Sequence, residues 1–396
     1  MEEVVLAEAK RTAFGNFGGA LKEIPAVELA AKAIRTVLDR MPVDDQEVDL
    51  VVMGHCLPGS GLSSVRQACI AAGLPLEMNA ITVERACCSA MYAMGMAFES
   101  IGNGRADIIL AGGLENMSQT PYMIPQMRWG QRLGDFMVMD ELVIRNPYLK
   151  APMAQYAGEV ALEWGIDRRE LDEWAVRSNL TWVDADRQGL FEDEIFPVTV
   201  ETRKETVVFQ RDEHPRPDSS VEKLAKLKVV YGSPTITAGN ASALSDGATA
   251  TMLMRRSEAQ ARGIRPLARI LDHISLSGEP RNSPVLPGVA IEKILSRNDL
   301  VLDDIELIEI NEAFASMPLV STLYMAGKDR KQAEKIRERL NVKGGAISIG
   351  HPIGATGARV VMTLAYEMRR RGTRYGIAAI CGAIGQANAM LLENID

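Results

Sequence analysis

The sequence PVDDQEVDLVVMGHC (residues 42–56) follows the same pattern as the later sequence VLDDIELIEINEAF (residues 301–314). In both, an acidic turn precedes a short apolar run, and the run ends at polar residues. A short apolar run bounded by turn signals is typical of a buried strand. The chain therefore uses one structural unit twice, and we predict two similar α/β halves, each a sheet covered by helices.

The first quarter of the chain alternates strand and helix patterns, and the last third repeats that order. Early strands are expected over 3–12, 48–56, 79–87 and 106–118, and early helices over 26–38, 65–72 and 89–104. In the last third we expect a helix over 287–298, a strand into a polar turn over 301–314, a glycine-rich approach to a helix over 344–372, and a buried strand into a turn over 375–391.

Residues 119–241 break this alternation and are richer in Trp, Pro and charge. Within them, RRELDEWAVRSNLTWVDADRQG (168–189) has a helical pattern. A long insertion in an α/β frame usually carries a binding or covering function. We therefore expect an N-terminal half over 1–118, to which 242–268 returns, an inserted binding domain over 119–241, and a C-terminal half over 269–396.

Composition narrows the class of protein. At 396 residues the chain exceeds the usual size of one domain, and 47% hydrophobic with 24% charged residues is typical of a globular protein. The formal charge of −8, without a basic run, argues against nucleic-acid binding. The acidic N-terminus lacks a signal-peptide core, and no apolar run reaches about 18 residues. We expect a cytoplasmic protein that binds neither nucleic acid nor membrane.

The five cysteines are odd in number, and their spacing does not match a metal site. We interpret them as thiols in a reducing compartment and predict no metal in this chain. The chain has only four histidines, so a mechanism that needs an imidazole must use one of them.

Cys87 lies in VERACCSAM (83–91), where a strand pattern meets a small-residue helix. A thiol at a helix N-terminus faces unpaired backbone N–H groups and the positive end of the helix dipole. Both favour the thiolate, and the same N–H groups can hold an oxyanion after attack. The alternative is a small thiol packed against the helix.

His351 lies in KGGAISIGHPIGATG (343–357), a glycine-rich loop before another helix. Its glycines allow close approach of a ligand, and Pro352 fixes the turn. A structural turn with an incidental histidine is the alternative, and the P-loop pattern is absent. If the two halves are related, His351 and Cys87 precede equivalent helices and lie close together.

Three further stretches hold candidate residues. Cys381, in AAICGAIGQ (378–386), ends a buried strand, and a thiol there could exchange protons or simply fill the core. Asn311 and Glu312 follow another strand, where polar residues often serve as caps. Asn240 and Ser242 belong to a loop with a capping pattern. A basic cluster in the insertion is either a ligand site or a solvated helix face; its members are Arg216, Lys223, Lys226 and Lys228.

The combination of these stretches resembles the thiolase family (acetyl-CoA acetyltransferases and 3-oxoacyl-CoA thiolases) from end to end, as a divergent member. The matching motifs are GGLENMS (112–118), DEHPRPDSSVEKLAKLK (212–228), TAGNASALSDGA (237–248), NEAFA (311–315) and GGAISIGHPIGATG (344–357). The resemblance implies two βαβαβαββ halves stacked as α-β-α-β-α layers, with the insertion as a coenzyme A-binding loop domain. It also implies coenzyme A as a substrate.

The resemblance also implies a role for each matching residue. Cys87 would take the acyl group as a thioester, and His351 would accept the thiol proton and donate to a first oxyanion site. Asn311 would hold a water at that site. Cys381 would protonate the leaving enolate or form it. The N–H groups of Cys87 and Ala383 would form a second oxyanion site.

For the coenzyme, the resemblance implies that Ser242 contacts the pantetheine portion and Arg216 the nucleotide portion. Met153 belongs to Pro152-Met153-Ala154, which stands where short-chain members have His-Met-Gly. Other departures are Glu84 before Arg85, Ala90 in place of a glycine, and Ala383-Ile384-Gly385 in place of a triple glycine. These changes favour a larger, branched or aromatic 3-oxoacyl-CoA, such as benzoylsuccinyl-CoA.

Four functions stay open at this point. The favoured one is an acyl-CoA C-acyltransferase that cleaves or forms a carbon–carbon bond by Claisen chemistry. The others are an acetyl-CoA acetyltransferase acting on acetoacetyl-CoA, a ketoacyl-synthase-like condensing enzyme, and an inactive thiolase-like binding subunit. The resemblance implies a homodimer or dimer of dimers, and some divergent members work with a small OB-fold, zinc-ribbon partner subunit.

Overall fold

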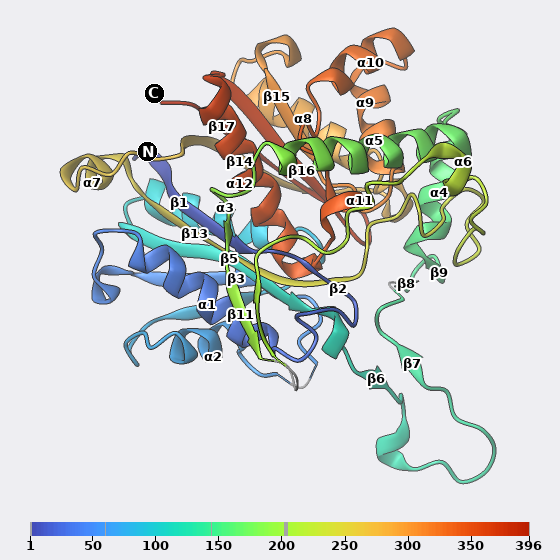
Figure 1. The fold of residues 1–396 in the computed structure, drawn as a ribbon, viewed down its shortest axis with the longest axis horizontal. Helices are drawn as coiled ribbons and strands as arrows, with labels where there is room; N and C mark the ends of the chain where they lie inside the picture. The colour runs from blue at the N-terminus through green and yellow to red at the C-terminus, as the bar shows by residue number, and fades with distance from the viewer. Residues whose placement is uncertain (1, 60, 144, 202–204, 396) are drawn as a thin grey trace.

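The computed structural model describes residues 2–59, 61–143, 145–201 and 205–395, and strands from both ends of the chain meet in one large mixed sheet (Figure 1). In spatial order its strands are β15 (Leu307–Ile310), β16 (Tyr375–Gly382), β17 (Gln386–Glu393), β14 (Ala268–Ser277), β1 (Val4–Thr12), β13 (Ser245–Arg255), β5 (Ile108–Asn116), β3 (Leu50–Gly54) and β4 (Ala80–Val83). Two short strands pair with this sheet outside that order: β2 (Gly15–Asn16) pairs with β13, and β10 (Ile195–Phe196) pairs with β1.

The sheet contains the same pairing pattern twice. In the first half β3 is parallel to β4 and β5, and antiparallel pairs then run from β5 to β13 and from β13 to β1. In the second half β15 is parallel to β16, followed by antiparallel pairs from β16 to β17 and from β17 to β14. A parallel bridge between Ile308 and Leu340 stands where β4 pairs with β3. The predicted pair of similar halves is confirmed.

The halves are joined where β1 pairs with β14, from Val4 opposite Ile270 to Leu6 opposite Ala268. Helices α3 (Ser89–Gly102) and α12 (Ile353–Arg371) contact strands of both halves and form the layer between them. Helices α1 (Ala26–Asp39) and α2 (Ser64–Ala71) cover the outer face of the first half. Helix α8 (Leu286–Arg297), backed by α9 (Ser316–Met325), covers the second. Separate apolar cores fill the middle layer and the two outer interfaces.

The insertion contributes helices α4 (Met153–Glu163), α5 (Arg168–Arg187) and α6 (Val221–Leu224), and the hairpin of β11 (Val198–Glu201) and β12 (Thr206–Phe209). Helix α5 begins at Asp167, whose side chain forms a capping box with Glu170. This helix confirms the pattern read over 168–189. Its Trp174 and Ser178 side chains both donate hydrogen bonds to buried Glu312, which ties the insertion to the second half.

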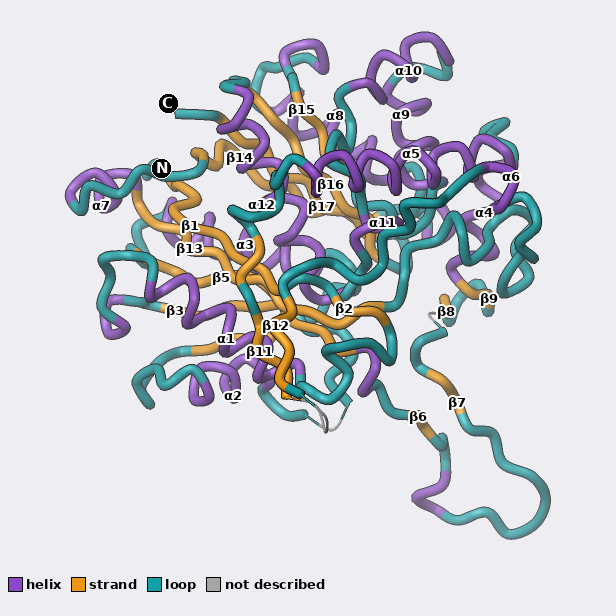
Figure 2. Tube along the Cα trace, in the orientation of Figure 1, coloured by secondary structure: helices purple, strands orange, loops and turns teal. Residues whose placement is uncertain are grey.

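One part of the insertion extends away from the body as an arm (Figure 2). It contains the short strands β6 (Tyr122–Met123) and β7 (Met139–Asp140), and β8 (Arg145–Asn146) and β9 (Ala151–Pro152) lie between the arm and the body. Its apolar side chains are open to solvent: Trp129 is 87%, Leu133 91% and Met137 72% exposed. An apolar surface of this kind is typical of a contact with another molecule.

Some elements differ from those predicted. The strand expected over 79–87 ends at Val83, because the chain turns sharply at Ala86, where φ is +47°. The strand expected over 48–56 covers only Leu50–Gly54. The region expected as a strand into a turn over 375–391 is a hairpin of two strands, β16 and β17. Six elements were not predicted from the sequence: β13, β14, α9, α7 (Arg256–Ala261), α10 (Arg330–Glu338) and α11 (Ala346–Ile349).

No helix in the described part of the chain is both long and apolar enough to cross a membrane. Within the same residues, no group of three or more His, Cys, Asp or Glu side chains comes together as a metal site. All five cysteines are free thiols.

Candidate active site

Cys87 stands at the start of α3, in a turn that its neighbours hold rigidly. Ala86 adopts a left-handed conformation, which a residue with a Cβ rarely does and which costs free energy. The Ser89 hydroxyl fixes this turn, because it accepts from the Arg85 N–H at 2.7 Å and donates to the Ala86 carbonyl at 2.6 Å. The thiol is thereby placed at the helix N-terminus, as predicted, with only 6% of the residue exposed.

Two backbone N–H groups favour the charged form of the Cys87 thiol. Burial raises the pKa of Cys87 to about 12, whereas hydrogen bonding to its own N–H and to that of Ala383 favours the thiolate and lowers the pKa. Cys87 is therefore a neutral thiol in the resting site. The same two donors can stabilise negative charge on an oxygen that develops next to the sulfur.

Cys381 comes from the other half of the sheet, near the end of β16. Burial raises its pKa, and the nearby Cys87 raises it further, so the two sulfurs lie within electrostatic reach of each other. The Cys381 sulfur contacts the Met317 sulfur at 3.6 Å. The neighbouring Cys88 thiol faces elsewhere and donates to the carbonyl of Ile380 at 3.5 Å.

His351 is held so that one ring nitrogen is free for chemistry. Its Nδ1 lies 2.7 Å from the Thr356 hydroxyl, which itself donates to the Pro352 carbonyl at 2.9 Å. Because the Thr356 hydroxyl already donates its proton to Pro352, it can only accept a hydrogen bond from His351. The ring proton of His351 is therefore on Nδ1, and Nε2 presents a lone pair. Burial lowers the pKa of His351 to about 3, with a smaller effect from Arg359, so the ring is neutral at physiological pH.

Asn311 lies beside that free nitrogen, with its Nδ2 3.5 Å from His351 Nε2. The Asn311 carbonyl oxygen accepts from Arg359 at 3.5 Å, so the amide group faces His351 with its donor end. Arg359 is fully buried and forms an ion pair with Glu309 at 3.6 Å. Arg359 therefore acts as a positioning residue for Asn311.

The two halves of the candidate site meet where α3 and α12 begin. A Cβ added to Gly54 would lie 2.6 Å from the Ala90 nitrogen and 2.7 Å from the Gly354 carbonyl oxygen. The first turns of both helices therefore close on the end of β3. The Glu115 carboxylate fixes the same junction, accepting from the N–H groups of Cys56 and Gly354. The predicted proximity of the segments that hold Cys87 and His351 is thus seen in the structure.

The residues expected to contact coenzyme A lie in two separate places. Arg216 is exposed and borders a cleft of about 460 Å³, and the lining also includes His214, Ala243 and Leu244. The Ala243 carbonyl accepts from the His351 N–H at 3.2 Å, so the cleft wall adjoins the histidine. Ser242 is partly buried next to that wall, and its N–H donates to the Ala313 carbonyl at 3.0 Å.

Met153 is buried at the start of α4 in an apolar cluster with Cys381, Ala383 and Met317. The basic cluster is only partly consistent with a ligand site. Lys223 is paired with Asp218 at 2.6 Å on the surface, which fits a solvated helix face.

Glu312, the other polar residue singled out in this strand end, is structural. Its carboxylate accepts from Trp174, Ser178, the Asn341 amide and the Ile347 N–H, and is fully buried.

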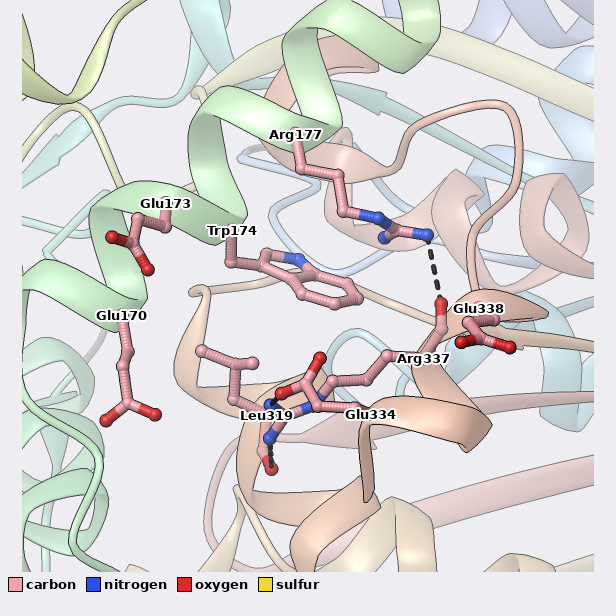
Figure 3. A pocket seen from close by; sticks show the side chains of 8 residues that line it. All are labelled: Glu170, Glu173, Trp174, Arg177, Leu319, Glu334, Arg337 and Glu338. Atoms are coloured by element: carbon pink, nitrogen blue, oxygen red, sulfur yellow. Dashed lines mark hydrogen bonds and ion pairs between the residues drawn. The ribbon is translucent and has the colours of Figure 1, made fainter. Parts of the chain in front are cut away.

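A separate pocket of about 310 Å³ lies on the far side of Trp174 (Figure 3). There Arg177 sits over the indole ring at 4.5 Å and donates to the Arg337 carbonyl. None of the predicted site residues lines this pocket.

Two features of the site were missed from the sequence. Thr356 orients His351, and Arg359 orients Asn311. They follow His351 by five and eight residues, on the helix that the glycine-rich segment leads into. Tyr156, on α4, is buried near both Cys87 and Cys381, which each raise its pKa. Only Thr356 and Arg359 had a sequence signal, since they follow the histidine on a helix whose N-terminus was already a candidate.

Comparison with known families matches nearly the whole chain. Residues 4–257 match the model described as the N-terminal domain of thiolases, and residues 264–394 match the model of the thiolase C-terminal domain. An acetyl-CoA acetyltransferase of Escherichia coli (strain K12) is 40% identical over 403 residues, which cover 100% of each chain. A beta-ketoadipyl-CoA thiolase of Pseudomonas aeruginosa is 37% identical, with 99% of each chain covered.

Solved structures give the same result for the fold. The crystal structure of an acetyl-CoA acetyltransferase from Bacillus anthracis superposes with a TM-score of 0.94 at 38% identity, covering 99% of each chain. The human mitochondrial 3-ketoacyl-CoA thiolase superposes with a TM-score of 0.93 at 34% identity, again over 99% of each chain.

Proposed function

The chain belongs to the thiolase family of acyltransferases, and on that premise we propose that it cleaves or forms 3-oxoacyl-CoA by Claisen chemistry through an acyl group on Cys87. One observation supports this proposal above the others. The N–H groups of Cys87 and Ala383 both act on the Cys87 sulfur, and the Cys381 thiol lies within its electrostatic reach. One nucleophile, one set of oxyanion donors and one further acid/base are what two-step acyl transfer between carbon and sulfur requires.

In the cleavage direction, His351 Nε2 takes the proton of the Cys87 thiol as the sulfur attacks the 3-oxo carbon of the substrate. The resulting oxyanion accepts hydrogen bonds from the N–H groups of Cys87 and Ala383. When the bond between C2 and C3 breaks, the electron pair stays on C2 as an enolate of the shortened thioester. The Cys381 thiol gives its proton to that carbon, and the acyl group remains on Cys87.

In the second step the thiol of free coenzyme A attacks the Cys87 thioester. Cys381, now a thiolate, takes the proton of that thiol, and His351 returns its proton to the departing Cys87 sulfur. The products are the thioester released in the first step and the acyl group now joined to coenzyme A. Every side chain regains its resting protonation state. The enolate oxygen of the first step would be held by His351 and by a water on Asn311. Arg359 keeps the Asn311 amide in that orientation.

For the coenzyme, we propose that residues 119–241 form its binding domain. Arg216 would contact the nucleotide end and Ser242 the pantetheine, with Met153 against the reactive end. The position of Arg216 on an open cleft whose wall adjoins His351 supports this assignment.

The acyl group is proposed to be larger, branched or aromatic, benzoylsuccinyl-CoA being one example. In support, the start of α4 lacks the histidine of short-chain members, since Pro152 is its N-cap residue. The second candidate is acetoacetyl-CoA, which is favoured by the names of relatives such as the E. coli acetyl-CoA acetyltransferase. The P. aeruginosa beta-ketoadipyl-CoA thiolase shows that other members near this identity have longer substrates in their names.

A substrate panel tests this proposal. Purified protein is given coenzyme A and, separately, acetoacetyl-CoA, a straight-chain, a 2-branched and an aromatic 3-oxoacyl-CoA, and loss of free thiol is followed. We expect thiolysis of the larger esters with a kcat/KM above that of acetoacetyl-CoA. Equal or greater activity on acetoacetyl-CoA would support the second candidate, and inactivity on all four would reject the proposed reaction.

We further propose that the apolar arm packs on another copy of the chain, in a homodimer or dimer of dimers. Its exposed Trp129, Leu133 and Met137 support this. Analytical ultracentrifugation of wild type and of a Trp129→Ser, Leu133→Ser variant tests it, with a smaller assembly expected for the variant. A small OB-fold, zinc-ribbon subunit is the competing occupant, and it would appear as a second chain in material purified under native conditions.

A further inference from the structure

Tyr156 stands out in the second turn of α4. Its side chain is buried, with 2% of the residue exposed, in a cluster that otherwise consists of apolar residues and a thiol. The neighbours in that cluster are Met153, Ala157, Ala313, Met317, Cys381 and Ala383. Cys381 and Ala383 belong to the proposed active site, so the tyrosine lies in the wall next to the reacting carbons.

The hydroxyl of this tyrosine is buried without a hydrogen bond. No partner of ordinary length and angle is found for it among the described residues, although the side chains of Ser283 and Asn146 are close enough to lower its pKa. Burial itself raises that pKa, so the group is a neutral O–H donor. A buried polar group that lacks a partner costs free energy, and each such group in a folded protein calls for an explanation.

Asn146 shows the same feature from the adjacent segment. Its Oδ1 accepts from the N–H groups of Tyr148 at 2.9 Å and Leu149 at 3.1 Å. This fixes the orientation of the amide, because a flipped group would place its NH₂ against those two donors. The Nδ2 end is therefore a donor, and it too is buried without a partner in the described structure. The Asn146 amide lies close enough to the Tyr156 oxygen to act on it as a donor, and the phenolic proton itself still lacks an acceptor of ordinary geometry among the described residues.

A missing partner is not a general feature of tyrosine hydroxyls in this molecule, as the partly buried Tyr366 shows. The Tyr366 hydroxyl donates to Glu8 at 3.0 Å or to the Ala9 carbonyl at 2.8 Å, and accepts from Lys10 at 3.2 Å. The donors at Tyr156 and Asn146 therefore mark a place where an acceptor from another molecule is expected.

We propose that Tyr156, supported by Asn146, is a specificity residue that donates a hydrogen bond to an uncharged oxygen, a carbonyl or hydroxyl, on the acyl chain of the substrate. This rests on the proposed function. The reacting oxygens already have donors, namely the N–H groups of Cys87 and Ala383 and the pair of His351 and Asn311, so the acceptor must be an additional oxygen. An uncharged oxygen fits because Tyr156 packs against apolar side chains and a thiol, where a buried charged oxygen would be costly without a cation beside it.

Binding of unreactive thioethers tests this without turnover. The probes are S-hexyl-CoA and S-oxohexyl-CoA isomers, which carry a ketone at the fourth or the fifth carbon, beyond the reacting 3-oxo position, and dissociation constants are measured by calorimetry for wild type and Tyr156→Phe. We expect wild type to bind one ketone isomer about tenfold more tightly than the alkyl ether. Tyr156→Phe should bind all three alike. Absence of a preference in wild type, or an unchanged preference in the variant, overturns the proposal.

Thermal unfolding distinguishes a hydroxyl that has no hydrogen-bond partner from one that is bonded within the folded protein. Tyr156→Phe should unfold at the wild-type temperature or above it, because no hydrogen bond is lost and a buried polar group is removed. The matched variant Tyr366→Phe, which loses bonded partners, should unfold at a lower temperature. A decrease for Tyr156→Phe as large as that for Tyr366→Phe would mean that the hydroxyl has an internal partner, and would overturn the proposal.

Turnover distinguishes failure of this inference from failure of the proposed function. Tyr156→Phe should lower kcat/KM less on acetoacetyl-CoA, which has no additional oxygen, than on a 3-oxoacyl-CoA that carries one. A large equal loss on every substrate would make Tyr156 a general part of the reaction and reject its role in specificity. If wild type shows no turnover at all, the proposed function fails, whereas the thioether measurements still decide the role of Tyr156.

Discussion

Gly357 of α12 lies directly against Met91 of α3: a Cβ on the glycine would be 2.4 Å from the Met91 backbone nitrogen and 3.0 Å from its Cβ. The two helices therefore meet nearly backbone to backbone. Cys87 stands just before the first turn of α3, and His351 stands just before the first turn of α12. The distance between nucleophile and base thus depends on how closely the helices approach.

Gly357→Ala tests this dependence. In a helix, replacing glycine by alanine normally stabilises by up to about 1 kcal/mol. Here the added methyl group meets backbone atoms, so we expect destabilisation by roughly 1–3 kcal/mol and a lower kcat as His351 moves from Cys87. Urea unfolding and steady-state kinetics are the measurements. An increase in stability with unchanged kcat would show that the contact is not tight.

Cys381→Ser separates the two chemical steps. The hydroxyl has nearly the size of the thiol, but its pKa is far too high to exchange a proton with carbon. Acylation of Cys87 by a simple acyl-CoA should survive, whereas cleavage of a 3-oxoacyl-CoA should fall by about 10²- to 10⁴-fold. Exchange of α-protons with solvent, followed by NMR, should fall with it. Wild-type rates for cleavage and exchange would reduce Cys381 to a core thiol.

Arg216→Ala tests the coenzyme site. The nucleotide end is remote from the reacting carbon, so the arginine would contribute equally to ground-state and transition-state binding. We expect the KM for coenzyme A to rise about tenfold with kcat within about twofold of wild type. The matched control is Arg187→Ala, an exposed arginine at the end of α5 away from the cleft, which should change neither constant. A loss confined to kcat would contradict the assignment.

Buried histidines make stability dependent on pH. Burial lowers the pKa of His351 to about 3 and that of His273 to about 4, against 6.5 for an ordinary histidine. Between pH 6.5 and 4 the unfolded chain binds protons that the folded chain does not. The free energy of unfolding should therefore fall as pH falls, by up to about 1.4 kcal/mol per pH unit for each group, and be unaffected by these groups above pH 7.

His273→Gln gives the check, because it removes one of these groups away from the proposed site. Urea unfolding at pH 7 and pH 5 should show a smaller loss of stability for the variant than for wild type. Equal losses would mean that His273 is not held neutral in the folded protein.

The sequence allowed prediction of those site residues that lie in a recognisable local motif. The acidic turn and apolar run before His55 and before Asn311 revealed the duplication, and the duplication in turn indicated that Cys87 and His351 approach each other. Strand β13 was missed because its SDGATATMLMR sequence is rich in small residues with weak strand preference, and its conformation depends on pairing with β1 and β5. Tyr156 could not be identified, since its unpaired hydroxyl results from burial between distant segments.

The most direct test of the account is the identity of the acylated residue. Wild-type protein is exposed briefly to an acyl-CoA, quenched in acid and digested, and the peptide with Arg85 to Ser89 is fragmented by mass spectrometry. Cys88→Ala is the matched control, because its thiol faces the Ile380 carbonyl. The account predicts one acyl group on Cys87 in both proteins and none in Cys87→Ala. An acyl group on Cys88 alone, or unchanged acylation in Cys87→Ala, would contradict it.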